Sequence, residues 1–109
     1  MKKLIAIAAL MCGTAHAEFF TGNDLLNRLN SENAYERGTA IGYILGAHDT
    51  GRGAVHCSPD GATGTQVRDI VKAHLESTPE VRHLAADSHV TFILRKVWPC
   101  AEKKKGTSL

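Results

Sequence analysis

The chain has 109 residues, of which 43% are hydrophobic and 22% are charged, and its formal net charge is +2. This length suits one globular domain and is too short for several domains or for a doubly wound nucleotide-binding fold. Ordinary hydrophobic content together with a low net charge also argues against a disordered chain.

The first 17 residues have the three-part pattern of a secretory signal peptide. A basic start at residues 2–3 is followed by an apolar stretch over residues 4–11 and by Ala15-His16-Ala17, which supplies the small side chains that signal peptidase accepts. The apolar run is far shorter than the roughly 20 residues of a membrane-spanning helix. We therefore expect cleavage between Ala17 and Glu18, export to the periplasm, and a mature chain without a membrane span.

Cleavage at that position also changes the charge of the chain. Because Lys2 and Lys3 would be lost, the mature chain, which we interpret as a single domain over residues 18–109, has a formal net charge of zero. Three of its lysines stand at 103–105 within residues 101–109, which we expect to be a flexible tail. The sequence has no basic patch with interleaved aromatic residues, so nothing in it indicates binding to nucleic acid.

Two cysteines, Cys57 and Cys100, remain in the mature chain. Two such thiols usually pair in an oxidising compartment, and a disulfide closing a loop of this length stabilises a small domain by roughly 4 kcal/mol in the chain-entropy model. The alternative is that Cys57 is a nucleophile activated by its neighbour His56. Adjacent residues seldom have the geometry for that chemistry, and a disulfide would consume the thiol, so we favour the structural bond.

Local patterns predict two helices and then a loop in the first half of the mature chain. The three leucines within residues 25–29 lie on one face of a first helix, which begins after the polar cluster Thr21–Asp24. Ser31 is the expected N-cap of a second helix that runs to about Asp49. The segment 51–64 is rich in Gly, Ser, Pro and Asp and is expected to be a loop.

The second half of the mature chain is also predicted to be helical. Thr63 followed by Gln66 fits a capping box at the start of a third helix, and Pro79 suits the first turn of whatever follows the break at residues 77–80. Two apolar stripes have helical spacing, Val67, Ile70, Val71, Leu75 and then Ala86, Val90, Ile93, Leu94, Val97. No segment alternates with period two over a useful length. We therefore predict an all-α fold, a small bundle of four to five helices joined by one disulfide.

The second predicted helix contains Gly38, Gly42 and Gly46, which share one stripe because they recur every four residues. Each glycine costs up to about 1 kcal/mol in a helix interior relative to alanine. Such a stripe is expected where another helix or a second chain approaches the backbone closely. We favour packing within the chain's own core, with a second subunit as the alternative.

Histidines are the only other side chains in the sequence that suggest chemistry. Five stand in the mature chain, at positions 48, 56, 74, 83 and 89, and none has the spacing of a metal site. His74 lies on the apolar stripe of the third helix and is expected to be a hydrogen-bonded residue at the edge of the core. For Asp49 we favour a structural pairing with Arg52 or a loop amide over an acid–base role with His48. The sequence thus predicts no catalytic residues, no metal and no cofactor.

An ordered series of landmarks resembles the Rap1a/Tai family of immunity proteins and covers nearly all of residues 19–100. The landmarks are Phe20–Leu26 (FTGNDLL), Gly42–Asp49 (GYILGAHD), Cys57–Gly61 (CSPDG), Gln66 with the helix that follows it, Pro79–His83 (PEVRH) and Trp98–Cys100 (WPC). Two positions depart from the family pattern. Leu29 stands where relatives often carry another cysteine, and Trp98 occupies a position that is usually Phe-like.

The resemblance implies a small, all-helical periplasmic protein, often a homodimer. Such proteins bind peptidoglycan amidase toxins of type VI secretion systems and block them sterically, because a protruding loop and a helix surface cover the active-site groove of the toxin. The resemblance transfers no individual binding residues. On exposure and turn chemistry alone, the candidates for partner binding are Arg52, Glu76, Thr78, Glu80, Arg82 and His83.

Two other functions fit parts of the sequence. A small, disulfide-linked periplasmic chaperone of the acid-stress type is compatible with five histidines and a neutral mature chain, but the landmarks do not resemble that family. A periplasmic enzyme that uses His48, Asp49 or His56 is the third hypothesis, and the sequence suggests no geometry for its site.

Overall fold

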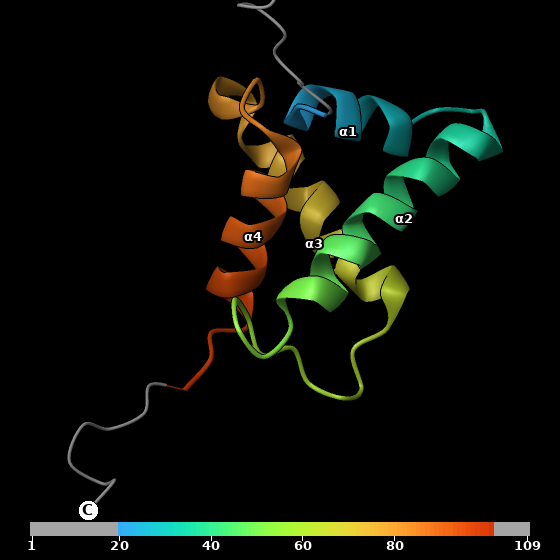
Figure 1. Ribbon diagram of the computed structural model, residues 1–109. Helices are drawn as coiled ribbons and strands as arrows, with labels where there is room; N and C mark the ends of the chain where they lie inside the picture. The colour runs from blue at the N-terminus through green and yellow to red at the C-terminus, as the bar shows by residue number, and fades with distance from the viewer. Residues whose placement is uncertain (1–19, 102–109) are drawn as a thin grey trace, which may run out of the picture.

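The computed structural model describes residues 20–101, which form helices and no β-strand. The elements are α1 (Gly22–Leu29), α2 (Ala34–Gly51), α3 (Gly64–Ser77), the short 3₁₀ helix η2 (Pro79–Val81) and α4 (Ala86–Val97) (Figure 1). The predicted all-α bundle is confirmed. The expected cleavage site after Ala17 and most of the expected tail, residues 102–109, lie outside the described residues.

Side-chain caps fix where the first two helices begin. Thr21 and Asp24 form a full capping box, since the hydroxyl of Thr21 accepts from the Asp24 amide and the Asp24 carboxylate accepts from the Thr21 amide, both at 3.1 Å. The predicted N-cap Ser31 is wrong, because α2 begins after Asn33. The Asn33 side chain accepts from the amide of Tyr35 at 2.8 Å, whereas the hydroxyl of Ser31 accepts from the Asn33 amide itself.

The third helix begins where the sequence predicts. The hydroxyl of Thr63 accepts from the Gln66 amide at 3.1 Å and caps α3. Pro79 starts η2, as its fixed backbone angle favours. All four α-helices then supply buried apolar side chains to one core: Leu25, Leu26, Leu29, Ala40, Ile44, Val67, Val71, Leu75, Ala86, Val90, Leu94.

The glycine stripe of α2 does not pack within the chain, so that prediction is wrong. A Cβ atom built on Gly38, Gly42 or Gly46 would meet nothing within 4 Å in the described part of the chain. The core lies on another side of α2, which buries Ala40 and Ile44 against the bundle. Gly42 and Gly46 instead line an open groove of about 550 Å³ that Thr91 of α4 also borders, and which we call the glycine groove.

Close packing against a glycine occurs at Gly22, in the first turn of α1. A Cβ there would lie 2.7 Å from the carbonyl oxygen of Arg82 and 2.8 Å from the ring of His89. The same turn is held by backbone hydrogen bonds, because the Gly22 amide donates to Leu84 and the Asn23 amide donates to Arg82, both at 2.8 Å. The start of α1 is therefore fixed to the segment that joins η2 to α4.

The two long connections lie at opposite ends of the bundle. The segment between α3 and α4 lies beside α1 at the top of Figure 1, and the connection from α2 to α3 lies at the bottom. The predicted disulfide Cys57–Cys100 is present at this lower end, with its Cα atoms 4.8 Å apart. The amide of Cys57 also donates to the carbonyl of Trp98 at 2.8 Å, so the lower connection is fastened to the end of α4.

Candidate functional site

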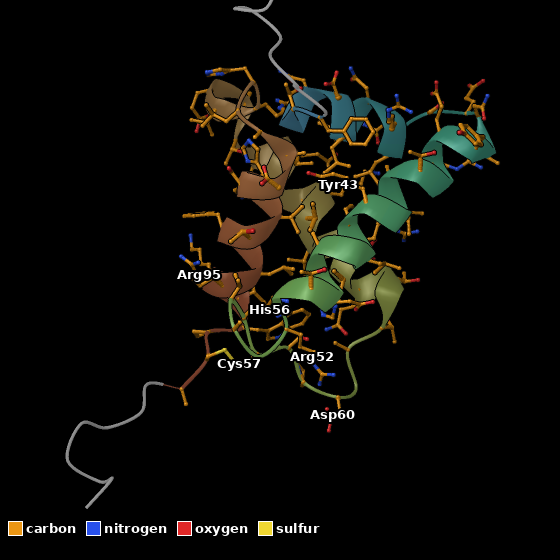
Figure 2. The ribbon with its side chains drawn as sticks, viewed as in Figure 1. Tyr43, Arg52, His56, Cys57, Asp60 and Arg95 are labelled. Atoms are coloured by element: carbon orange, nitrogen blue, oxygen red, sulfur yellow. A yellow bond between two sulfur atoms is a disulfide. The ribbon has the colours of Figure 1, made fainter. Side chains whose placement is uncertain are left out.

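The structure divides the six candidate partner-binding residues between these two ends. Arg52 lies in the connection from α2 to α3, residues 52–63, which we call loop 52–63 (Figure 2). The other five lie around the end of α3 and η2 at the opposite end: Glu76, Thr78, Glu80, Arg82, His83. The structure therefore does not bring the six candidates together on one surface.

The five upper candidates also differ in exposure. Glu76, Glu80 and His83 are exposed. Thr78 and Arg82 are half-buried, and the hydroxyl of Thr78 donates to the carbonyl of His74 at 2.9 Å. Its part in ending α3 makes Thr78 a less suitable partner-binding residue than its exposed neighbours.

Arg52 is exposed and holds loop 52–63 through its guanidinium. Its Nε donates to the carbonyl of Ser58 at 3.2 Å, and its guanidinium forms an ion pair with the carboxylate of Asp60. The expected pairing of Asp49 with Arg52 is wrong, because the carboxylate of Asp49 contacts the ring of His48 at 2.9 Å. Asp60 and its neighbours Pro59 and Gly61 are exposed at the tip of the loop, as Figure 2 shows for Asp60.

A second set of hydrogen bonds fixes the base of the loop. The Nε2 of His48, on the last turn of α2, lies 2.8 Å from the hydroxyl of Ser58. The amide of Ser58 donates to Nδ1 of His56, so the other ring nitrogen, Nε2, carries the proton that is donated to the His48 carbonyl at 2.9 Å. Both histidines therefore join the end of α2 to the beginning of loop 52–63.

The hydrogen-bonded series Ser58, His48, Asp49 has the order of a hydrolase triad, and Ser58 could not be linked to it from sequence because it lies ten residues from His48. A triad nucleophile must reach a substrate, whereas Ser58 is only 5% exposed. The contacts of His48 with Ser58 and Asp49 therefore hold the loop in place and do not expose a reactive hydroxyl. The disulfide likewise uses the thiol of Cys57, which removes the nucleophile proposed beside His56.

At the upper end, His74 is buried and hydrogen-bonded, as predicted. Its Nε2 lies 3.0 Å from Nδ1 of His89, and His74 is only 9% exposed to solvent. Burial lowers the pKa of His74 below its ordinary value of 6.5, and electrostatic repulsion from His89 and then from Lys96 lowers it further. His74 is therefore a neutral imidazole near pH 7.

Within residues 20–101, no three or more His, Cys, Asp or Glu side chains group in a way that could hold a metal ion. None of the helices in the same range combines the length and the apolar character of a membrane span.

Comparison with known proteins gives one match. A search of curated proteins and a search of solved structures each return no significant similarity. The model of the Rap1a immunity proteins, in contrast, matches residues 21–100, a range that includes every helix of the described residues and both cysteines of the disulfide. The chain belongs to the Rap1a immunity protein family.

Proposed function

We propose that this protein is a periplasmic immunity protein that binds and sterically inhibits a peptidoglycan amidase toxin of a type VI secretion system. The family match over residues 21–100 carries the proposal. The signal-peptide pattern of residues 1–17 supports a periplasmic location, where such a toxin would act. Inhibition by occlusion requires a shaped surface and no catalytic residue of the protein's own.

Loop 52–63 is the element that we propose for occlusion. Its tip is exposed, while its base is held by the disulfide, by the ring of His48 and by the guanidinium of Arg52. A loop that is ordered before binding loses less conformational entropy in the complex, so more of the contact free energy becomes affinity. A firmly held, protruding loop is therefore well suited to fill the groove of an enzyme.

A capture experiment tests this proposal. The protein is purified from the periplasm as the cell processes it, and is used to capture partners from the periplasmic and secreted fractions of competing bacteria. We expect one amidase in stoichiometric amount, with its peptidoglycan hydrolysis blocked. Asp60→Arg at the loop tip should release the amidase, whereas Glu32→Arg, at an exposed carboxylate between α1 and α2, serves as the matched control and should not. Capture without inhibition would contradict occlusion.

A second candidate function is that of an acid-stress chaperone. The observation that favours it is the pair of exposed apolar residues Leu84 and Phe92 beside the buried His74, since protonation of this histidine at low pH would weaken the packing around them. This function predicts many clients that are captured only at acid pH. The same capture experiment, repeated at acid pH, separates the two functions.

We also propose that the protein forms a homodimer through the glycine groove. The groove is open in the single chain and allows close approach to the backbone of α2. Tyr43 lines it, and burial, followed by the negative charge of Asp87, raises the pKa of the Tyr43 phenol and keeps it neutral. An uncharged groove along a glycine-rich helix is suited to a second copy of α2.

A further inference from the structure

A cavity of about 310 Å³ lies at the upper end of the molecule, between α3, η2 and α4. We call it the histidine cavity, because His74 and His89 line it together with the apolar side chains of Val81, Leu84 and Phe92. It lies at the end opposite loop 52–63, and the occlusion mechanism leaves it without a role.

The hydrogen bonds of the two histidines fix their tautomers. The carbonyl of Val81 can only accept, so Nε2 of His89 carries the proton that is donated to it at 2.9 Å. Nδ1 of neutral His89 is therefore an acceptor, and Nε2 of His74, 3.0 Å away, must donate to it. It follows that Nδ1 of neutral His74 carries no proton.

This last nitrogen is an acceptor that lacks a donor. Among the described residues, no side chain or backbone group hydrogen-bonds to Nδ1 of His74, whose side chain lines an otherwise mainly apolar cavity, and this atom is not fully buried, so solvent can reach it. A donor group that binds in the cavity would take the place of solvent at this acceptor. A ligand that supplies one donor on an apolar ring would satisfy the acceptor and fill the cavity at the same time.

The size of the cavity and its rim indicate the source of that ring. An apolar cavity of about 150 Å³ accommodates benzene, so this cavity has room for a phenol or an indole. Phe92 is 56% and Leu84 48% exposed at the rim, where a single ring would leave them partly uncovered. A protein surface around the ring would cover both, and tyrosine and tryptophan are the side chains that most often anchor such contacts.

We propose that the histidine cavity is a docking site for a tyrosine or tryptophan side chain of a protein partner, whose O–H or N–H group donates to Nδ1 of His74. Phe92 provides an apolar wall, and its ring centroid lies 5.5 Å from that of His74. The proposal goes beyond the proposed function, since it does not depend on loop 52–63 or on the identity of any toxin.

Small probes test the chemistry directly. The protein, purified from the periplasm, is titrated at pH 7.5 with p-cresol, toluene, and the blocked tripeptides Gly-Tyr-Gly and Gly-Phe-Gly, and binding is followed by amide chemical shifts in NMR. We expect shifts around His74, Ser88 and Phe92, and about threefold to tenfold tighter binding of p-cresol than of toluene, the ratio that one hydrogen bond supplies. The tyrosine tripeptide should bind more tightly than p-cresol, because its backbone also contacts the rim.

Three variants separate the hydrogen bond from the apolar contact. His74→Phe should bind p-cresol and toluene equally, Phe92→Ala should weaken both, and Val97→Ala, an exposed apolar residue at the far end of α4, should change neither. Thermal unfolding of each variant verifies that it is folded. Equal binding of p-cresol and toluene by the unaltered protein, or shifts outside the cavity, would overturn the proposal. Binding of p-cresol but not of the tyrosine tripeptide would overturn the assignment to a protein partner.

Discussion

At the scale of single residues, His74 couples the stability of the protein to pH. Its pKa in the folded state is below 6.5, because burial and then electrostatic repulsion from His89 and Lys96 disfavour its protonation. Well above pH 6.5, His74 is neutral in both the folded and the unfolded chain, and it does not reduce the free energy of unfolding. As the pH falls through 6.5, His74 becomes protonated in the unfolded chain but stays neutral in the folded chain. The free energy of unfolding therefore decreases until folded His74 is protonated as well.

Urea unfolding as a function of pH checks this coupling. His74→Phe should flatten the decrease in the free energy of unfolding between about pH 7 and the lower pKa of the folded state. His83→Gln, which removes an exposed imidazole, is the control. A pH profile of His74→Phe that is identical to that of the unaltered protein would show that the cavity does not disfavour the charged form.

Two glycines make a matched pair at the same scale. A Cβ on Gly38 meets nothing in the described chain, and Gly38 does not line the glycine groove, so Gly38→Ala should raise the free energy of unfolding by up to about 1 kcal/mol through the better helix propensity of alanine. Gly22→Ala should lower the melting temperature strongly, because its Cβ would lie within 3 Å of the Arg82 carbonyl and the His89 ring. A destabilised Gly38→Ala would mean that something covers this end of α2 in solution.

At the scale of elements, the ring of His48 holds loop 52–63 through the hydroxyl of Ser58. Ser58→Ala removes the hydroxyl and leaves Nε2 of His48 unpaired, which should lower the free energy of unfolding by roughly 1–3 kcal/mol, the cost of an unpaired buried polar group. We expect faster amide hydrogen exchange in loop 52–63, with exchange in α3 and α4 much less affected. Unchanged exchange in the loop would show that the disulfide and Arg52 suffice to hold it.

The disulfide holds the same loop to the end of α4. Replacing both cysteines, Cys57→Ser with Cys100→Ser, avoids a free thiol and should lower the melting temperature markedly, since the bond closes 43 residues of chain and contributes roughly 4 kcal/mol in the chain-entropy model. Binding to the captured amidase should persist wherever the variant is folded. An unchanged melting temperature would show that the cross-link contributes little to stability.

The boundaries of the elements show how far local sequence determines this fold. The caps at Thr21 and Thr63 were predictable because each interacts with residues three positions away. Ser31 failed as a cap because Asn33, an equally good capping residue, stands two positions closer to the helix. The side of α2 that meets the core depends on the other helices, so the sequence alone could not show that the glycines face outward.

Loop 52–63 and the histidine cavity were also only partly predictable from the sequence. The sequence indicated loop 52–63 through its Gly, Pro and Asp content, but not the bond between His48 and Ser58, which depends on how the loop folds back on α2. His74 was correctly placed at the edge of the core, whereas its partner His89 lies on another helix, fifteen residues away. Patterns within one helix are readable from sequence, and contacts between helices are not.

At the scale of the whole molecule, the histidine cavity lies at the end opposite loop 52–63, whereas the glycine groove along α2 extends to Val55 of that loop. The loop tip, Pro59 to Gly61, does not line the groove, so a partner bound at the tip leaves the cavity and the groove available. The proposed dimer would therefore present two copies of loop 52–63 and could bind two toxin molecules.

The mass of the protein in solution tests this arrangement. We expect sedimentation equilibrium to give twice the mass of the mature chain, and Gly42→Leu or Gly46→Leu to give a monomer, because a leucine side chain would fill the groove that the second α2 enters. The melting temperature of the dissociated monomer reports whether the fold survives, as the open space around both positions predicts. Phe92→Ala, at the histidine cavity, should leave the dimer intact. Leucine variants that remain dimeric would place the interface elsewhere, and a monomeric unaltered protein would leave the glycine groove as an uncovered face of α2.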